Sequence, residues 1–398
     1  MHKLFGILNK AMREKNPKKV AVLMSGGVDS SVSAAMLKKQ GYAVTGFFMI
    51  LNKTQKAKEA QDSAKKVAQL LGIPFCAIDL SSLFHRKIID YLVREYKSGR
   101  TPNPCVVCNQ EIKFGVMLDR ALSLGFDYVA SGHYVRRESG IRNPACALRA
   151  SAFVKTSADR SAGRQESGRY KLFKARDKKK DQSYFLYTLT QDKLKHLLFP
   201  LGNLTKQEVR VMAKKMGLPV YDRKESQDIC FLAGEKIQDF LKKKIQTRPG
   251  KIMDIETQKV LGEHQGLPFY TLGQRKGIGI GGTGPYYAVK LDFGKNILWV
   301  TSKTNDPKLQ GKMLKLGKVN WIAGRSPKFP FQCRVKIRYS HLPAEATIEK
   351  VKNDHLSVIM EKSQRAITPG QSAVFYSGQE LLGGGIIQKL TPTPKILV

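Results

Sequence analysis

A glycine-rich loop that joins an expected strand to an expected helix constrains the fold of this chain more than any other feature. Residues 20–24 are a short apolar run of the kind that forms buried parallel strands. Residues 25–31 then read Ser-Gly-Gly-Val-Asp-Ser-Ser, and residues 30–39 place apolar side chains on one helical face. The glycines let the backbone approach a phosphate, and the helix N-terminus supplies N–H groups and a positive dipole end. The sequence thus predicts a phosphate-binding strand–loop–helix unit.

The loop also limits the chemistry that it can support. It lacks the Gly-Lys-Ser/Thr ending of a Walker A sequence, so transfer of a γ-phosphate is not the expected reaction. Ser25, Ser30 and Ser31 offer hydroxyl donors, and Asp29 is suited to orient a loop amide or a Mg²⁺ ion. The alternative, an ordinary glycine-rich turn, is disfavoured because strand, loop and helix occur in the required order.

Strands and helices alternate through the first half of the chain. The next expected elements are strands at 42–50, 75–80 and 128–130 and helices at 57–71 and 83–96. This alternation predicts an α/β fold with a doubly wound parallel sheet through about residue 190.

A different pattern follows in the second half. Thr205 and Glu208 form a capping box that opens a helix. Further on, short alternating runs predict a small all-β barrel; they lie at 286–291, 297–301, 333–339 and 373–376. We therefore expect three domains: a domain with the parallel sheet at 1–200, a small central α+β domain at 201–283, and a C-terminal β-barrel at 284–398.

The charge of the chain points to a polyanionic partner. Lys and Arg number 69 against 32 Asp and Glu, a formal charge of +37. Nucleic acid would relieve this repulsion through counterion release; a generally basic proteome or a salt-adapted surface is the alternative. An anionic membrane surface fits less well because the lysines are spread along the chain. A basic, aperiodic stretch at 142–168 predicts a mobile insertion, which either helps to hold RNA or is a solvated loop.

Location follows from the N-terminus and the cysteines. No apolar run approaches the roughly 20 residues that cross a bilayer, so no membrane partner is expected. Six cysteines are too sparse for a disulfide scaffold, and we expect a reducing, cytoplasmic setting. The basic residues 1–19 leave a mitochondrial targeting peptide as an alternative.

The loop at 25–31 resembles the PP-loop of ATP pyrophosphatases, which cleave ATP between the α- and β-phosphates. Cys105 and Cys108 lie in Asn-Pro-Cys-Val-Val-Cys-Asn, and a distant Cys230 ends Glu-Ser-Gln-Asp-Ile-Cys. Together with the motifs at 132–134, 180–186 and 272–282, these residues resemble the tRNA-specific 2-thiouridylase (MnmA) family over nearly the whole chain.

This resemblance implies a reaction and its partners. The wobble uridine of the tRNAs for Lys, Glu and Gln would be adenylated on O2 by Mg²⁺-ATP, releasing pyrophosphate and then AMP. Cys230 would carry a persulfide received from a sulfur-donor protein. Cys108 would attack Cys230 as the nucleophile, leaving a transient Cys108–Cys230 disulfide that a thiol pool reduces.

The resemblance also implies the other site residues. ATP would be bound by Leu23, Met24, Ser25, Gly26, Gly27, Val28, Asp29, Ser30, Met49 and Gly132. The target base would meet Asn103, Pro104 and Cys105. The tRNA would be contacted by His133, Lys180, Asp181, Gln182, Arg338, Tyr339 and Gln371.

Several alternatives remain open. Some family members carry Asp where Cys105 stands, and a thiol does not copy a carboxylate's acid–base role. With Cys108 and Cys230, Cys105 would supply three thiolates to an iron–sulfur cluster, which we favour less than a persulfide. An amidotransferase-type synthetase such as argininosuccinate synthase gives the cysteines no task, and a non-catalytic RNA-binding protein has no need of the intact loop. The glycines at 277–282 are expected to form a loop rather than a dinucleotide site, because no helix follows.

Overall fold

The structure is a computed structural model, and it describes residues 17–139, 169–223, 230–232, 234–281, 284–351 and 355–389. The predicted basic insertion at 142–168 and residues 1–16 lie outside the described residues. The chain forms two compact units. The first comprises Met1–Ser82, Glu111–Ser183 and Gln191–Glu225, and the second comprises Leu83–Gln110, Tyr184–Thr190 and Ser226–Val398.

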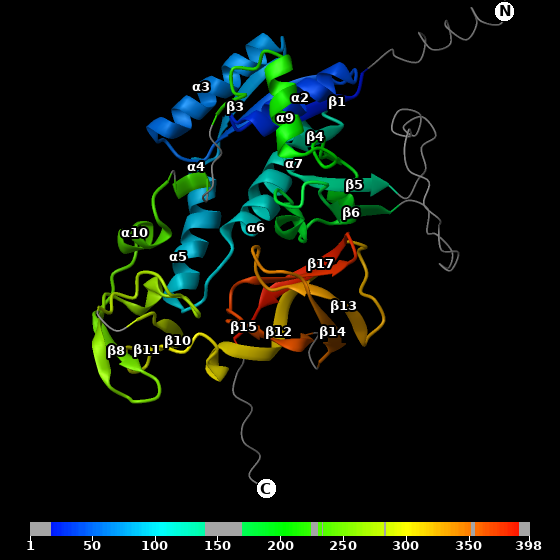
Figure 1. The fold of residues 1–398 in the computed structure, drawn as a ribbon. Helices are drawn as coiled ribbons and strands as arrows, with labels where there is room; N and C mark the ends of the chain where they lie inside the picture. The colour runs from blue at the N-terminus through cyan, green and yellow to red at the C-terminus, as the bar shows by residue number, and fades with distance from the viewer. Residues whose placement is uncertain are drawn as a thin grey trace, which may run out of the picture. The chain divides into compact units, whose positions relative to one another are not determined.

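The first unit is built on a five-stranded sheet whose strands are all parallel (Figure 1). The strand order is β3-β2-β1-β4-β7, so the order reverses between β1 and β4. The strands are β1 (Lys19–Leu23), β2 (Ala43–Ile50), β3 (Phe75–Asp79), β4 (Tyr128–Ser131) and β7 (Leu197–Leu198). The predicted doubly wound α/β fold is confirmed.

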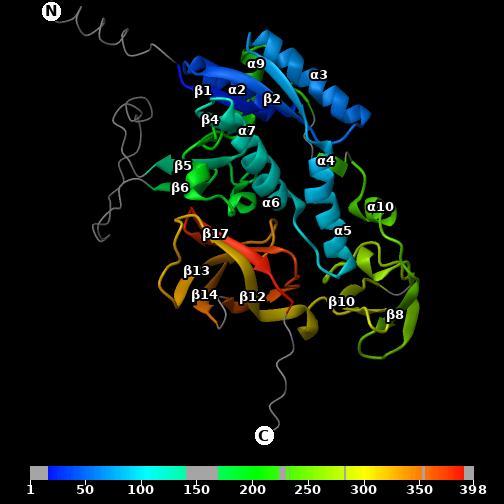
Figure 2. The same cartoon turned by 180° about the vertical axis from the view of Figure 1, so that it is seen from behind.

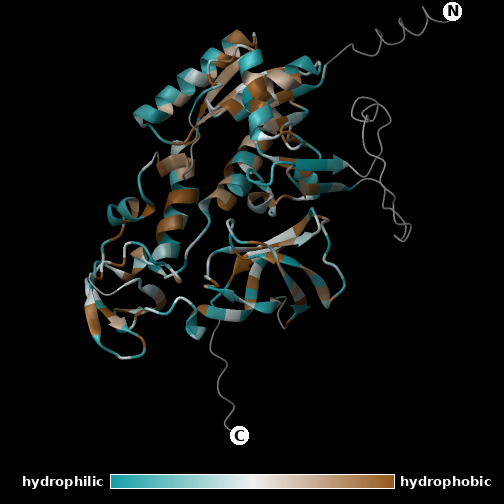
Figure 3. Ribbon diagram, viewed as in Figure 1, coloured by the Kyte–Doolittle hydropathy of each residue, from teal (hydrophilic) through white to brown (hydrophobic). Residues whose placement is uncertain are grey.

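Helices cover this sheet because β1 is apolar on both faces. Val20 and Val22 belong to one core cluster, and Ala21 on the opposite face is equally buried. The helices of the unit are α2 (Val28–Lys39), α3 (Gln55–Leu70), α7 (Met117–Ser123), α8 (Gln191–Leu194) and α9 (Lys206–Lys215). Figure 3 shows α3 mostly in teal, as expected of a helix that buries a narrow stripe, here Ala64, Val67 and Ala68.

An antiparallel hairpin completes the first unit. Its strands are β5 (Val135–Ser139) and β6 (Tyr170–Lys174). The boundary between the two units falls within three short elements along the chain. These are α4 (Ser81–Phe84), η2 (Asn109–Val116) and η4 (Ser183–Leu186).

The second unit contains a helical segment and a four-stranded sheet. The helical elements are η1 (His85–Ile89), α5 (Asp90–Lys97), α6 (Pro104–Cys108), η5 (Cys230–Leu232), α10 (Ile237–Lys242), η6 (Leu267–Phe269) and η7 (Pro307–Leu309). The sheet has the order β10-β11-β8-β9, with β8 (Gly250–Asp254), β9 (Val260–His264), β10 (Tyr287–Asp292) and β11 (Ile297–Thr301). The strands expected at 286–291 and 297–301 are therefore present, but their assignment to the barrel is wrong because β11 pairs with β8.

A separate antiparallel barrel ends the second unit (Figure 2). Its strands run in the order β12-β15-β14-β13-β16-β17, and pairing of β12 with β17 closes it. They are β12 (Gln310–Trp321), β13 (Phe331–Lys336), β14 (Ala344–Lys350), β15 (Leu356–Arg365), β16 (Ser372–Ser377) and β17 (Glu380–Ile387). Alternate side chains of these strands, such as Cys333 and Val335, fill the interior. The predicted C-terminal β-barrel is confirmed.

Membrane insertion through a helix finds no support. Within the described residues, none of the helices combines the length and the apolar composition needed to cross a bilayer.

Candidate functional site

The point where the strand order of the parallel sheet reverses brings two loops together. The loop after β1 and the loop after β4 leave neighbouring strands, and ligands of doubly wound sheets bind at such a reversal. Gly132 begins the second loop, and a Cβ added to it would lie 2.8 Å from the Ser30 backbone nitrogen. The structure therefore brings Gly132 against the loop at 25–30, as a shared nucleotide site requires.

The turn of the first loop depends on Gly26. Its φ is +75°, a conformation that favours glycine, and an added Cβ would lie 2.2 Å from the Ala60 carbonyl oxygen. The Gly26 carbonyl accepts hydrogen bonds from Ser63 Oγ at 3.1 Å and from an Arg223 guanidinium nitrogen at 2.7 Å. The loop is thus held by α3 and by Arg223 within the first unit.

Helix α2 begins directly from this loop, and its first turn is suited to an anion. The N-cap is Gly27, so no side chain caps the helix. The Ser30 and Ser31 hydroxyls donate to the Gly27 carbonyl at 3.2 and 2.9 Å, and neither hydroxyl caps the helix. The N–H groups of the first turn have no acceptor within their own helix and carry the positive end of its dipole. This set of donors fits a phosphate.

Asp29 lies in that first turn and is held by two side chains. Lys206 Nζ is 2.7 Å from both Asp29 carboxylate oxygens, and the Tyr134 hydroxyl donates to Oδ1 at 2.7 Å. The Lys206 side chain is only 11% exposed and that of Asp29 is 33% exposed. Our sequence analysis missed Lys206 and Tyr134. A signal was present, because Lys206 is the first residue of a capped helix, where the dipole disfavours a cation.

Met49 lies at the same edge of the sheet. The last residue of β1, Leu23, pairs with Phe47 of β2, so Met49 extends two residues beyond the end of β1. Its side chain is half-buried. This position fits the expected contact with adenosine, which stays a prediction.

His133 is buried rather than presented to solvent. It is 9% exposed, its Nδ1 lies 2.8 Å from Ser131 Oγ, and its ring contacts those of Phe114 and Phe199. Burial lowers the pKa of His133 well below its ordinary 6.5, and the charge of Lys113 lowers it further. In this structure His133 is therefore a neutral ring that braces the loop after β4.

This burial predicts a pH dependence of stability. Below about pH 6.5 the unfolded chain binds a proton that the folded His133 does not, so stability falls as the pH falls. The loss is at most about 1.4 kcal/mol per pH unit for one group. Thermal unfolding between pH 7.5 and 5.5 should show a shallower pH slope for His133→Gln than for the wild type. Parallel slopes would show that His133 does not contribute.

Hydrogen bonds within the first unit hold the segment 180–182. Asp181, 8% exposed, accepts from the Ala175 and Ser183 backbone nitrogens at 3.0 and 3.2 Å. Gln182 Oε1 accepts from the Tyr134 backbone nitrogen at 3.0 Å. Gln182 thus holds the loop that carries Gly132, Asp181 fixes the turn between Ala175 and Ser183, and Lys180 is half-buried. Their expected tRNA contacts stay predictions.

The cysteine helix α6 belongs to the second unit. Asn103 is its N-cap and accepts from the Cys105 and Val106 backbone nitrogens at 3.2 and 3.4 Å, and Pro104 occupies the first helical position. Cys105 is half-buried and Cys108, the last residue of α6, is buried. The Asn-Pro pair therefore sets the start of the helix that carries both thiols.

Cys230 lies on the exposed turn η5 of the same unit. The next residue, Phe231, contacts Phe84 with ring centroids 5.5 Å apart. Helix α6 packs against η1, which begins at the residue after Phe84. Both cysteine-bearing elements therefore pack on adjoining parts of one helical segment. Residues 225–229 of the Cys230 motif lie outside the described residues.

Cysteine thiolates are also common ligands of metal ions. Among the described residues, which include Cys105, Cys108 and Cys230, no three Cys, His, Asp or Glu side chains are grouped to hold a metal ion.

Gln371 holds the backbone of the segment that leads into α6. Its Nε2 donates to the Thr101 carbonyl at 2.9 Å, and the Thr101 backbone nitrogen donates to the Pro369 carbonyl at 2.9 Å. Arg100 is fixed by a double hydrogen bond to Glu95 at 2.7 Å. The chain entering the cysteine helix is thus clamped within the second unit.

Arg338 and Tyr339 follow β13 and lie in a cationic aromatic cluster. Tyr339 is 39% exposed and its ring centroid is 4.6 Å from that of Phe185. Lys336 Nζ lies 5.3 Å from the Tyr339 ring centroid. Burial and the charge of Arg365 lower the pKa of Arg338. An exposed ring beside cations suits base stacking and phosphate pairing.

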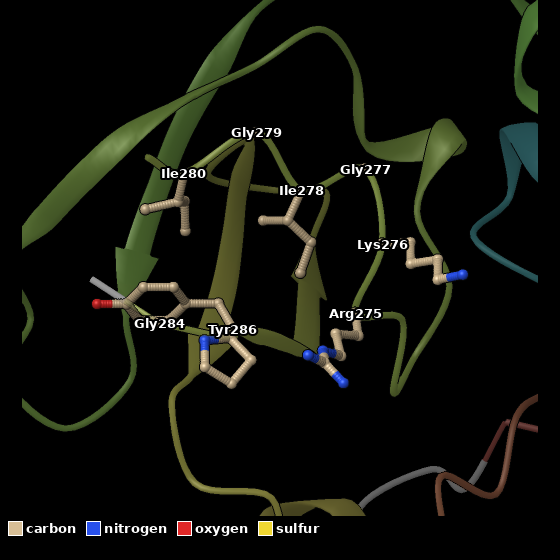
Figure 4. Close-up of a pocket in the computed structure, with 9 residues that line it drawn as sticks. Arg275, Lys276, Gly277, Ile278, Gly279, Ile280, Gly284 and Tyr286 are labelled. Atoms are coloured by element: carbon tan, nitrogen blue, oxygen red, sulfur yellow. The ribbon is translucent and has the colours of Figure 1, made fainter. Parts of the chain in front are cut away.

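Residues 277–280 of the glycine loop line a hollow of about 590 Å³ in the second unit (Figure 4). Arg275 and Lys276 lie to one side of it and Tyr286 to the other. The next element is strand β10, not a helix, so the loop lacks the helix N-terminus of a dinucleotide site.

The family of this chain is identified by its similarity to known proteins. Three family models match in order: tRNA methyl transferase HUP domain (residues 18–234), tRNA methyl transferase PRC-barrel domain (238–302) and Aminomethyltransferase beta-barrel domain (311–387). The chain is 42% identical over 387 residues to the tRNA-specific 2-thiouridylase MnmA of Carboxydothermus hydrogenoformans, covering 94% of this chain and 98% of that protein. The chain belongs to the tRNA-specific 2-thiouridylase family.

Further similarities differ in weight. MnmA 1 of Caldanaerobacter subterraneus, another 2-thiouridylase, is 43% identical over 384 residues, covering 93% of this chain and 98% of that protein. Among solved structures, the U34-tRNA thiolase NcsA from Methanococcus maripaludis with its [4Fe-4S] cluster is 20% identical with a TM-score of 0.33, covering 58% of this chain and 67% of that one. A likeness at that level carries no argument about the site.

The domains of the 2-thiouridylase family agree with the architecture. The HUP match contains the whole parallel sheet, the PRC-barrel match contains β8 to β11, and the third match contains most of the closed barrel. The PRC-barrel match thus groups β10 and β11 with the strands that they pair with.

Proposed function

We propose that the protein catalyses ATP-dependent 2-thiolation of the wobble uridine in the tRNAs for Lys, Glu and Gln. The observation that carries this proposal is the uncapped first turn of α2 against Gly132, in a chain 42% identical over its length to a 2-thiouridylase. The anion site alone would serve any nucleotide enzyme, and the family supplies the substrate class.

ATP is the proposed source of a leaving group. The O2 of uridine leaves poorly as oxide, and transfer of AMP to it releases pyrophosphate and makes that oxygen part of a good leaving group. The first turn of α2 and the loop at 25–27 would hold the phosphates, with Met49 and Gly132 beside the adenosine. Mg²⁺ would neutralise phosphate charge, and the Asp29 carboxylate in the first turn of α2 would help to hold it.

Sulfur transfer is assigned to Cys230 and Cys108. A donor protein would load the exposed Cys230 with a persulfide, whose terminal sulfur attacks C2 of the adenylated uridine. Cys108 then attacks Cys230 Sγ. The S–S bond of the persulfide breaks, a Cys108–Cys230 disulfide forms, and AMP departs with the former O2. A thiol reductant restores both cysteines.

The target base would lie against Asn103, Pro104 and Cys105. Gln371 supports this assignment indirectly, because it fixes the Thr101 carbonyl two residues before Asn103. Arg338, Tyr339 and Lys180 would contact the tRNA, and His133, Asp181 and Gln182 would act on it indirectly, because His133 and Asp181 are buried and Gln182 holds the Tyr134 backbone. The net charge of +37 supports a polyanionic substrate.

The test is reconstitution of the full chain with unmodified tRNA, Mg²⁺-ATP, a persulfide donor and a thiol reductant. We expect one 2-thiouridine per tRNA at the wobble position, detected by mass spectrometry, with stoichiometric AMP and pyrophosphate. Iron and sulfide are assayed in anaerobically purified protein as a control. Thiolation that proceeds without ATP, or that needs a stoichiometric cluster, would overturn the proposed mechanism.

A further inference from the structure

The position of Asp29 creates an electrostatic conflict in the nucleotide site. It lies in the first turn of α2, the turn that would receive phosphate. A carboxylate there cancels part of the positive helix end and repels an anionic ligand, although it would stabilise an empty helix. A phosphate site at this turn therefore needs a group that offsets the charge of Asp29.

Lys206 is placed to do so. Its Nζ is 2.7 Å from both carboxylate oxygens, and it comes from α9, 177 residues along the chain. As the first residue of α9, Lys206 is itself in an unfavourable dipole position, and its side chain is 11% exposed. Its backbone nitrogen donates to Asp177 at 2.9 Å, and the capping box of Thr205 and Glu208 fixes the start of the helix.

Tyr134 joins this pair to the loop that carries Gly132. Its hydroxyl donates to Asp29 Oδ1 at 2.7 Å, and Lys206 Nζ lies 5.9 Å from its ring centroid. The Tyr134 backbone is bound in turn by Gln182. The carboxylate is thus held in one orientation by groups from two elements outside α2.

We propose that Lys206 is a positioning residue for ATP: it neutralises and orients Asp29, which keeps the first turn of α2 receptive to phosphate. This inference rests on the proposed function, because it concerns the same ATP site. Lys206 need not touch the nucleotide for this role. Its effect is specific to charge, so it discriminates ATP from a ligand without phosphates.

Calorimetry of the full chain in EDTA, which removes bridging Mg²⁺, measures the effect with ATP and adenosine as probes. Lys206→Met should weaken ATP binding roughly 10- to 100-fold. The reason is that the Asp29 carboxylate, no longer neutralised by Lys206, repels the phosphates at an effective dielectric constant of about 20. Adenosine affinity should change less than about twofold. Lys206→Arg, which keeps the charge, should lose less than Lys206→Met.

Asp29→Asn separates charge from simple packing. Without the carboxylate there is no charge to offset, so in EDTA the ATP affinity of Asp29→Asn should fall less than that of Lys206→Met. Adding Asp29→Asn to Lys206→Met should restore most of the lost affinity, and this double variant leaves no lone buried charge to impair folding. Equal weakening by both single variants, or no rescue in the double variant, would overturn the inference. A wild-type chain that does not bind ATP would instead refute the proposed function.

Discussion

Replacing either of two cysteines by serine is expected to abolish 2-thiouridine formation. Cys230→Ser removes the thiol that would accept the persulfide, and Cys108→Ser removes the thiol that would release sulfur from it. A serine hydroxyl forms no persulfide and is a poor nucleophile toward sulfur at neutral pH. Affinity for tRNA should stay within about twofold, because binding of a large polyanion is spread over many phosphate contacts.

The two variants should stop at different stages. With a labelled sulfur donor, Cys108→Ser should accumulate a label on Cys230 that a thiol reductant removes, while Cys230→Ser should carry none. The position of Cys230 on an exposed turn favours loading by a donor protein, whereas Cys108 is buried at the end of α6.

Matched controls are available among the other cysteines. Cys76→Ser changes a cysteine that is exposed, as Cys230 is, but that lies on β3 of the other unit. Cys333 lies in the barrel core, where burial raises its pKa to about 12 and keeps it a protonated thiol. Both control variants should retain thiolation. Full activity in Cys108→Ser or in Cys230→Ser would refute the role of that residue.

Local patterns were sufficient for much of the fold. The apolar run, the glycines and the helical face around residues 20–39 predict β1, the loop and α2 because each depends on near neighbours. The structure differs by starting α2 at Val28, two residues before the predicted start, so that Gly27 becomes the N-cap. The capping box of Thr205 and Glu208 is confirmed for the same reason, since its two hydrogen bonds lie within one turn.

Long-range partners could not be predicted in this way. The runs at 286–291 and 297–301 have the alternation of a β-strand, but nothing in that alternation tells which strand β11 joins. Lys206 and Asp29 are both polar residues at helix starts, and only folding brings them within 2.7 Å. His133 was expected to contact tRNA on a motif alone, and the motif does not report that Phe114 and Phe199 surround it.

Gly132→Ala is expected to weaken ATP binding at least roughly 100-fold. The added Cβ would lie 2.8 Å from the Ser30 nitrogen and 2.9 Å from the Asp29 carbonyl carbon. Both are backbone atoms, which cannot rotate away as the end of a side chain can. The first turn of α2 must shift, and the methyl group covers the Ser30 N–H. Strain of about 1–3 kcal/mol and loss of a charge-assisted hydrogen bond of about 1.5–3 kcal/mol together account for the effect.

Equilibrium binding of ATP to the full chain measures this change, with circular dichroism as the check on folding. Gly262→Ala is the matched control, because a Cβ there meets no atom within 4 Å and its backbone does not require glycine. It should bind ATP like the wild type. Because the proposed tRNA contacts lie outside the phosphate site, Gly132→Ala should still bind tRNA while failing to release pyrophosphate. ATP affinity unchanged by Gly132→Ala would show that the nucleotide does not occupy the first turn of α2, and the adenylation step would lose its place in the molecule.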